Sequence, residues 1–489
     1  MLSGCLCLVN FTEVKEIKCK NKGSKHILTK DIEESGQPHP NEKKSNLNSA
    51  RQSHSNRLSP KLLLKSLGPG LITGASDDDP SGIATFSQAG ARFGFGMLWL
   101  VIFQYPLMTA IQEMCARIGL ITGSGLAATI KKKYSRKVVF PLIGLLFIAN
   151  TINIGADIGA MSASVRLIFP HIPLIVATIS FAAFIILAQI LIPYKKYVKI
   201  LKYLTLSLLA YVITAIIVGG NWNQILVASI LPHVEFTSQY AVMFVAIFGT
   251  SISPYLFFWQ ASEEAEEDVE RHKIKEIISD RNSSHNEPKV AENEVKLMRA
   301  DIATGIGFSH FIMWAIMLTT AGSLYENGVT DIESADQAAK ALEPLVKSFP
   351  NAGQISEVIF ALGIIGTGLL AVPVLAGSAG YALADGFGWK EGLGKKFKDA
   401  RAFYLVIAVS VLTGLLINFI GIDPIQALIY AAVINGVVAV PILIALMKIA
   451  NDKEILRNRT NGRLSNVLGL ITVLIMGAGV VIMFVTWGI

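Results

Sequence analysis

Three consecutive carboxylates, Asp77, Asp78 and Asp79, lie in an otherwise apolar stretch and are followed directly by Pro80. Ionisable groups at membrane depth are costly and mostly face a cavity or a substrate path. Proline removes a backbone donor and breaks the helix, which frees carbonyl oxygens that can coordinate a cation. This stretch therefore predicts cation binding at a helix break, with a simple packing kink as the alternative.

A second break is expected within the run Gly249-Thr250-Ser251-Ile252-Ser253-Pro254-Tyr255. Pro254 has no backbone N–H, so carbonyl groups near Thr250 lose a donor, and Ser253 adds a hydroxyl oxygen. Every potential ligand in the two breaks is an oxygen, because neither break contains His, Cys or Met. Oxygen ligands suit hard cations such as Mg²⁺, Ca²⁺ and Mn²⁺, whereas softer metals favour sulfur and imidazole. The two breaks together predict a site for a hard divalent cation.

The residues of this predicted site differ in their expected roles. Asp79 directly precedes Pro80, a position that is pushed out of the α-helical region, so its carboxylate is expected to face the gap as the essential ligand. Asp77 and Asp78 are expected to be auxiliary, since three consecutive helical residues cannot share one face. Asn435, in a later apolar segment, offers an amide oxygen to the site or serves helix packing. The predicted metal-site residues are Asp79, Thr250, Ser253, Ser81, Gly82, Asp78, Asp77, Tyr255 and Asn435.

The composition of the 489-residue chain is that of a membrane protein. Hydrophobic residues make up 52% and charged residues 16%, with a mean hydropathy of +0.51, whereas soluble domains carry about 25% charged residues. The pI near 9.0 does not indicate a nucleic-acid partner, because the basic residues lie between the apolar segments. The four cysteines have neither metal-ligand nor disulfide spacing. No nucleophile–base constellation or phosphate-binding loop is present, so neither an enzyme nor a bound cofactor is expected.

About eleven apolar segments, each near the roughly 20 residues that cross a bilayer, follow a polar N-terminal tail. They cover 66–89, 96–119, 138–165, 173–192, 200–219, 238–262, 300–322, 352–382, 401–420, 424–448 and 465–487. Five loops hold 26 Lys and Arg, and the intervening loops hold four. The positive-inside rule then places the tail, residues 1–64, in the cytoplasm as a disordered segment and the C-terminus outside. We predict an all-α polytopic membrane protein of the cell membrane, with its transmembrane domain at 65–489.

The two breaks fall in the first and the sixth apolar segments. With five segments in each unit, an odd number, the chain ends the first unit on the opposite side of the membrane. The second unit therefore enters the membrane inverted relative to the first. Paired interrupted helices in two inverted halves mark a midplane binding site in secondary transporters. We predict a 5+5 inverted repeat with discontinuous helices 1 and 6, in which repeat one spans about 66–219, repeat two about 238–448 and an extra helix about 465–487.

Four motifs resemble those of the NRAMP (natural resistance-associated macrophage protein) divalent-metal transporters. They are Gly68-Pro69-Gly70, the Asp79-Pro80 break, Gln88-Ala89-Gly90 and the proline of the sixth segment. The resemblance runs from about residue 66 to the end of the chain. It implies the leucine-transporter-type inverted repeat and transport of divalent metals.

The chain departs from the family where metal choice and proton coupling are set. The family's Asp-Pro-Gly-Asn reads Asp79-Pro80-Ser81-Gly82, and its Met-Pro-His reads Ser253-Pro254-Tyr255. The methionine sulfur that favours Mn²⁺ and Fe²⁺ is thus absent, as is the histidine linked to proton movement. Asn153 and Ala156 stand where the family carries an Asp and a Glu associated with proton transfer. The pattern resembles the NRAMP-related magnesium transporter branch, which implies transport of Mg²⁺ and Mn²⁺ without proton coupling.

We therefore expect a transporter that imports Mg²⁺, with Mn²⁺ as a further substrate, by alternating access and without proton coupling. The small residues Ser81 and Gly82 leave room for a largely hydrated ion, and Mg²⁺ dehydrates reluctantly. One alternative is a proton-coupled Mn²⁺/Fe²⁺ symporter of the main NRAMP type. Another is an organic-solute symporter on the same fold, although three aspartates would repel a substrate carboxylate. The expected partners are the metal cation and membrane lipid, with no nucleic acid and no obligatory protein partner.

An acidic run, Glu263 to Asp268, follows the second break. We expect a solvated helix end on the cytoplasmic side. The alternative is an acidic vestibule that concentrates divalent cations at the inner mouth.

Overall fold

The computed structural model describes residues 68–192, 196–197, 204–270 and 292–486, and all regular secondary structure in these ranges is helical. The predicted tail, residues 1–64, lies outside them. The longer helices and the two half-helices of the first break are α3 (Pro69–Asp77), α4 (Pro80–Phe93), α5 (Leu98–Thr122), α7 (Arg136–Ile168), α8 (Leu174–Leu191), α10 (Leu209–Val218), α12 (Ser238–Ser251), α13 (Pro254–Glu270), α15 (Glu292–Ser323), α18 (Ala352–Phe387), α19 (Arg401–Ile417), α20 (Pro424–Ala450) and α22 (Arg463–Thr486). The shorter ones are α6 (Leu126–Lys133), α11 (Trp222–Ile230), α16 (Ala335–Lys340), α17 (Glu343–Val346) and α21 (Lys453–Leu456), with 3-10 turns at Gly94–Met97, Leu204–Leu208, Tyr325–Asn327 and Arg457–Arg459.

Each of the eleven predicted apolar segments falls on a helix or a helix pair, but fewer helices qualify as membrane spans by length and composition. In the described ranges there are 8, or 9 if the bent pair Leu206–Val218 and Trp222–Ile230 is one span. The difference from eleven has two sources. The stretch Pro80–Thr122 counts as one span although it contains both α4 and α5, and α19 has only 17 residues, short of the ~20 that a straight crossing needs.

Both predicted helix breaks are present. α3 ends at Asp77 and α4 begins at Pro80, while α12 ends at Ser251 and α13 begins at Pro254. Asp79 has an extended backbone (φ −69°, ψ 171°), as the residue before a proline requires. The breaks predicted from proline and polar neighbours are therefore confirmed.

Proline alone does not break these helices. Pro373 lies inside the continuous helix α18, and Pro441 lies inside α20. Apolar residues surround both prolines in the sequence. At the two breaks, by contrast, carboxyl, hydroxyl and amide side chains replace the backbone partners that a break removes, as the site geometry below shows.

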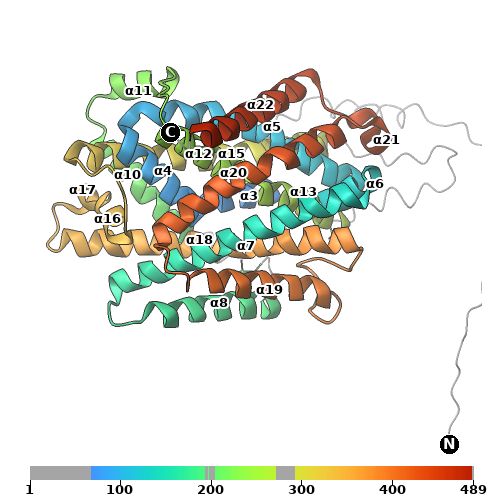
Figure 1. Cartoon of the computed structure of the whole chain (residues 1–489), viewed down its shortest axis with the longest axis horizontal. Helices are drawn as coiled ribbons and strands as arrows, with labels where there is room; N and C mark the ends of the chain where they lie inside the picture. The colour runs from blue at the N-terminus through green and yellow to red at the C-terminus, as the bar shows by residue number, and fades with distance from the viewer. Residues whose placement is uncertain (1–67, 193–195, 198–203, 271–291, 487–489) are drawn as a thin grey trace, which may run out of the picture. The chain divides into compact units, whose positions relative to one another are not determined.

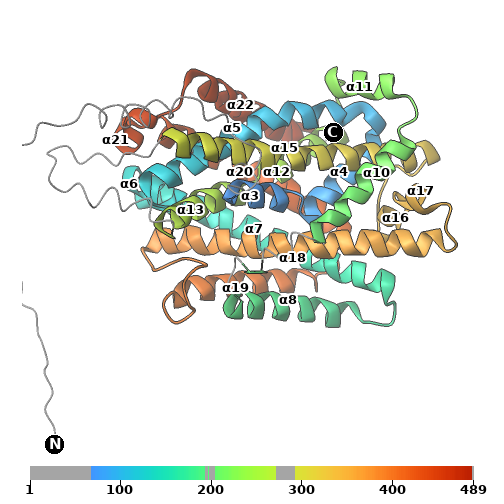
Figure 2. The same cartoon turned by 180° about the vertical axis from the view of Figure 1, so that it is seen from behind.

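The half-helices of the first break lie inside the bundle. Figure 1 shows α3 among the longer helices, and Figure 2, seen from behind, shows it beside α15. It also contacts α13 and α18. Glycines allow the close approach: a Cβ on Gly70 would lie 2.7 Å from the Ile302 nitrogen of α15. Likewise, a Cβ on Gly249 would lie 2.7 Å from the Gly436 Cα of α20 and closer still to the Ala432 carbonyl. Small residues that let backbones approach are the usual basis of helix association in membranes, and here they position both breaks.

Candidate cation site

The Asp79 carboxylate is the centre of the first break and is 1% exposed. It caps the N-terminus of α4, because Oδ1 accepts hydrogen bonds from the Gly82 N–H (2.7 Å) and the Ser81 hydroxyl (2.6 Å). Oδ2 accepts one from the Asn153 amide of α7 at 3.2 Å. These donors fix the carboxylate in one orientation. A preorganised carboxylate is what a cation ligand requires.

Tyr255, in the first turn of α13, reaches across to this carboxylate. Its hydroxyl oxygen lies 2.8 Å from the Ser76 carbonyl oxygen and 3.5 Å from Asp79 Oδ2. The single hydroxyl proton therefore goes to Ser76, the closer acceptor. Since each carboxylate oxygen has about two lone pairs, Asp79 Oδ2 keeps one free for a further partner.

Hydroxyl and carbonyl oxygens of the second break complete the arrangement. The hydroxyls of Ser81 and Thr250 lie 3.2 Å apart and join α4 to α12. The Ser253 hydroxyl donates to the Gly249 carbonyl at 2.9 Å, so it replaces a lost backbone donor. Pro254 cannot donate to the Thr250 carbonyl. A Cβ on Gly82 would lie 3.1 Å from the Asp77 carbonyl oxygen, which explains a glycine there.

Asp77 and Asp78 face α15 instead of α12. The Ser309 hydroxyl lies 3.0 Å from Asp77 Oδ2 and 3.0 Å from Asp78 Oδ1. One hydroxyl has one proton and serves one of these acceptors at a time. Among the residues that the structure describes, no group of three or more His, Cys, Asp or Glu side chains is arranged to hold a metal ion. The three consecutive aspartates therefore diverge, as helical geometry requires, and do not form a carboxylate cage.

Asn435 lies in α20, the helix against which α12 packs. It is fully buried, and neither amide atom has a hydrogen-bond partner in the described part of the chain. The neighbouring Gly436 packs on Val245 and Gly249 of α12. The assignment of Asn435 to the cation site stays a prediction.

Asn153 and Ser309 contact the aspartates but are not among the predicted site residues. The sequence does carry a signal for the α7 side, because Asn150, Asn153 and Asp157 recur at helical spacing in an apolar segment. The Asn150 amide donates to the Leu375 carbonyl of α18 at 3.0 Å, which ties α7 to its neighbour. The polar stripe of α7 thus combines helix packing with contact to the break.

The C-terminal helix ends at the breaks favour positive charge. The C-terminal ends of α3 and α12 carry the negative ends of their helix dipoles. Asp79 places a carboxylate at the N-terminus of α4 and offsets the opposite end of that dipole. The Asp79 carboxylate and the C-terminal ends of α3 and α12 therefore favour a cation, and the N-terminal end of α13 opposes them.

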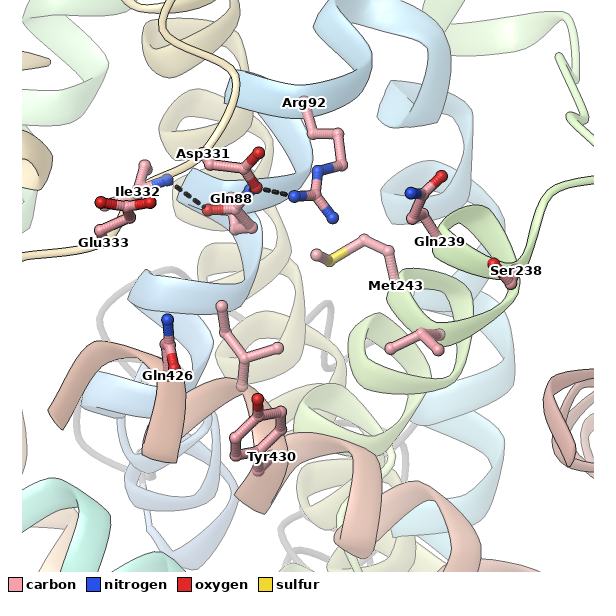
Figure 3. A pocket seen from close by; sticks show the side chains of 12 residues that line it. Gln88, Arg92, Ser238, Gln239, Met243, Asp331, Ile332, Glu333, Gln426 and Tyr430 are labelled. Atoms are coloured by element: carbon pink, nitrogen blue, oxygen red, sulfur yellow. Dashed lines mark hydrogen bonds and ion pairs between the residues drawn. The ribbon is translucent and has the colours of Figure 1, made fainter. Parts of the chain in front are cut away.

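A cavity of about 380 Å³ opens farther along α4 and α12 (Figure 3). Gln88 of α4 lies about 13 Å from Asp79 along the helix at ~1.5 Å per residue. The Gln88 side chain accepts from the Ile332 N–H (2.8 Å) and donates to the Thr330 carbonyl (3.0 Å), and Arg92 pairs with Asp331. The loop that carries Thr330, Asp331 and Ile332 is thereby fixed over the C-terminal end of α4. The other walls are Ser238, Gln239, Val242, Met243, Glu333, Gln426, Ile429 and Tyr430.

The acidic run after the second break is packed against α18. Glu264 is 6% exposed. The Tyr381 hydroxyl of α18 donates to Glu266 at 2.8 Å and also lies 3.3 Å from a Glu263 oxygen. The prediction of a solvated helix end is therefore wrong for these residues, because tertiary packing supplies donors that the local sequence does not reveal.

A pH-dependent stability is expected from Glu391, in the loop after α18. Burial, the nearby carboxyl of Asp385, to which it hydrogen-bonds, and the charge of Glu266 together raise its pKa to about 10, against the opposing effect of Lys395. Because the folded-state pKa lies above the ordinary value, this group stabilises the fold fully below about pH 4.5 and loses that contribution as the pH rises toward 10. We expect the thermal stability of wild type to fall between pH 5 and 9, on the order of 1 kcal/mol per unit.

Glu391→Gln tests this directly, since the amide still donates a hydrogen bond but does not ionise. The variant is expected to show a flatter pH dependence of its melting temperature and to exceed wild type at pH 9. Glu326→Gln, at an exposed position, serves as the matched control and should leave the wild-type slope unchanged. Parallel slopes for wild type and Glu391→Gln would contradict the assignment.

The family model for natural resistance-associated macrophage protein-like proteins matches residues 70–486. The chain belongs to this family. The divalent metal cation transporter MntH of Pectobacterium carotovorum subsp. carotovorum (strain PC1) is 24% identical to it over 426 residues, which cover 86% of this chain and 94% of that protein. The resemblance to this family, predicted from four motifs, is confirmed, and the NRAMP chain is an integral membrane protein.

Solved structures show the same fold. The manganese transporter of Eremococcus coleocola, in complex with an aromatic bis-isothiourea substituted compound, is 16% identical with a TM-score of 0.65, covering 88% of each chain. MHP1, a nucleobase-cation-symport-1 family transporter in a closed conformation, is 12% identical with a TM-score of 0.51, covering 86% of this chain and 90% of that one. The predicted inverted-repeat transporter fold with two discontinuous helices is confirmed for this NRAMP protein.

Proposed function

We propose that this NRAMP protein carries divalent metal cations across the membrane by alternating access, and that it imports Mg²⁺ and Mn²⁺ without proton coupling. The observation that carries the proposal is the fixed Asp79 carboxylate between the half-helices, with a free lone pair and with Ser81 and Thr250 hydroxyls beside it. The named relatives, a divalent metal cation transporter and a manganese transporter, support the substrate class. The cavity along α4 and α12 offers the approach from the face predicted to be extracytoplasmic.

The preference for Mg²⁺ rests on the ligand chemistry. The groups around Asp79 are hydroxyl, amide and carbonyl oxygens, which suit a hard and partly hydrated ion. Met313 of α15 accepts a hydrogen bond from the Ser251 hydroxyl (3.6 Å). The Ser309 hydroxyl lies 3.9 Å from the same sulfur but directs its one proton to Asp77 or Asp78. The Met313 sulfur is thus outside the set of donors that holds Asp79.

A second candidate is proton-coupled symport of Mn²⁺ and Fe²⁺, and one observation favours it. His310 is 4% exposed. It follows Ser309 in the sequence, and the Ser309 hydroxyl lies within hydrogen-bond distance of both Asp77 and Asp78. Its Nδ1 lies 3.0 Å from the Ile306 carbonyl, and Nε2 has no partner among the described residues. The His310 ring lies against Tyr105 of α5, with 5.9 Å between the ring centroids, and a buried imidazole that can change its charge is suited to proton transfer.

Purified protein in liposomes separates these candidates. Influx of Mg²⁺, Mn²⁺, Ca²⁺ and Cd²⁺ is measured with entrapped metal dyes, and an entrapped pH dye is recorded in parallel. We expect saturable entry of Mg²⁺ and Mn²⁺ with no change of internal pH. Acidification in step with Mn²⁺ entry, lost in His310→Gln, would establish the second candidate, and no flux of any of the four ions would overturn the proposal.

Met313→Leu tests whether a thioether sulfur takes part in binding the softer metal ions. This substitution keeps the volume but removes the sulfur. Unchanged relative rates for Mn²⁺ and Cd²⁺ are expected, whereas a selective loss of Cd²⁺ entry would show that the thioether contacts the ion and would contradict an all-oxygen site.

A further inference from the structure

Asp157, in the middle of α7, is a buried acid without a side-chain partner. It is 0% exposed, and neither carboxylate oxygen makes a hydrogen bond within 3.5 Å in the described part of the chain. The donor group that faces it is the backbone N–H of Ser81 at the start of α4. No ion pair among the described residues includes it. An uncompensated buried charge costs several kcal/mol, so Asp157 carries a charge only where a positive group offsets it and is otherwise protonated.

The position of Asp157 is defined by residues one turn away on either side. Asn153, four residues earlier, donates to Asp79 Oδ2. Met161, four residues later, lies with Pro80 against Gly368, since a Cβ on Gly368 would be 2.5 Å from the Met161 sulfur and 3.2 Å from Pro80 Cγ. Residues at i and i+4 share one helix face. Asp157 therefore faces the junction of α3 and α4 between these two contacts.

The electrostatic surroundings of Asp157 are negative. The carboxylates of Asp79 and Asp157 repel each other. Both also interact electrostatically with the Tyr255 hydroxyl. Between Asp157 and Asp79, the Asn153 Oδ1 atom is also buried and without a partner. The two Asp157 oxygens and Asn153 Oδ1 thus lie, without hydrogen bonds within 3.5 Å among the described residues, on the helix face that meets the junction of α3 and α4. At the same junction Asp79 Oδ2 has a free lone pair.

We propose that Asp157 supplies the second negative charge of the cation site and acts on a divalent cation through its hydration water. This rests on the proposed function. Asp77 and Asp78 face Ser309 of α15, so on the α7 side Asp79 offsets one of the two charges of a divalent cation, and Asp157 would offset the other. Water on the cation donates the hydrogen bonds that Asp157 and Asn153 Oδ1 lack. A purely structural Asp157 would instead be held by the N-terminal end of the α4 dipole.

Asp157→Asn distinguishes these roles by two measurements on the full-length protein. The first is the KM for Mn²⁺ and Mg²⁺ influx into liposomes, which we expect to rise at least about tenfold, in line with the loss of an outer-shell metal partner. The second is the melting temperature in detergent with and without Mn²⁺ at about 100 times its KM, where ligand binding to the folded state gives a measurable stabilisation. The metal-free variant is expected to melt higher than wild type, and its Mn²⁺-induced shift is expected to shrink.

The outcomes separate this proposal from the proposed function. Ser162→Ala, a buried α7 hydroxyl that bonds only its own helix, is the matched control and should behave as wild type. A lower metal-free melting temperature with unchanged KM would assign Asp157 to structure and overturn the inference alone. Absence of divalent influx in wild type would overturn the proposed function instead, whatever the variant does.

Discussion

Replacing Asp79 by asparagine is expected to lower Mg²⁺ and Mn²⁺ influx about 100-fold or more while leaving the protein folded. Asparagine has the same shape, and its Oδ1 still accepts from the Gly82 N–H and the Ser81 hydroxyl that now hold the carboxylate. The Asn153 amide can rotate its unpartnered oxygen toward the new amide. What disappears is the charge and the free acceptor of Oδ2. Loss of an outer-shell partner alone costs about 10–100-fold in metal affinity, and Asp79 is proposed as a direct ligand.

The measurement is initial influx in liposomes at matched protein density. Asp336→Asn makes the same chemical change at a surface ion pair with Lys340 and should retain the wild-type rate. A monodisperse elution profile and a metal-free melting temperature near that of wild type show that Asp79→Asn is folded. Influx within twofold of wild type in such a folded variant would remove Asp79 from the site and with it the main support for the transport proposal.

Replacing Gly249 by alanine is expected to destabilise the protein by about 1–3 kcal/mol or more, the range for overpacking a well-packed interior. The added Cβ would lie 2.7 Å from the Gly436 Cα and closer to the Ala432 carbonyl, so α12 and α20 must move apart. Backbone atoms cannot rotate away as a side chain would. Because Thr250 is the next residue, the shift also moves its hydroxyl away from Ser81, and transport falls with stability.

Gly144→Ala is the matched control. Gly144 lies inside α7, and a Cβ there meets nothing within 4 Å, so the same substitution should be neutral or mildly stabilising, since alanine is the better helix former by up to about 1 kcal/mol. Thermal melting and elution profiles of the two variants are compared in the same detergent. Equal melting temperatures would show that the close contact of α12 and α20 is not required.

Much of the fold can be predicted from local sequence. The apolar segments follow from the length needed to cross a bilayer, and the two breaks follow from Pro80 and Pro254 with their polar neighbours. The smaller number of helices that qualify as spans reflects boundaries that composition does not define, such as the continuous run through α4 and α5. The positions of Asp79, Ser81 and Thr250 at the breaks could be anticipated from Pro80 and Pro254, and their role as cation ligands stays a proposal.

What the sequence alone determined, then, is an all-helical membrane protein of the NRAMP family with an acidic break in its first helix and a hydroxyl-rich break opposite. Only the tertiary structure decided which groups meet there. It directs Asp77 and Asp78 to Ser309 of α15, gives Asp79 the amide of Asn153, and leaves Asp157 without a side-chain partner. It also packs the acidic run of α13 against Tyr381. The physical reason is that these partners lie on other helices, far away in the sequence, and helix packing alone brings them to the break.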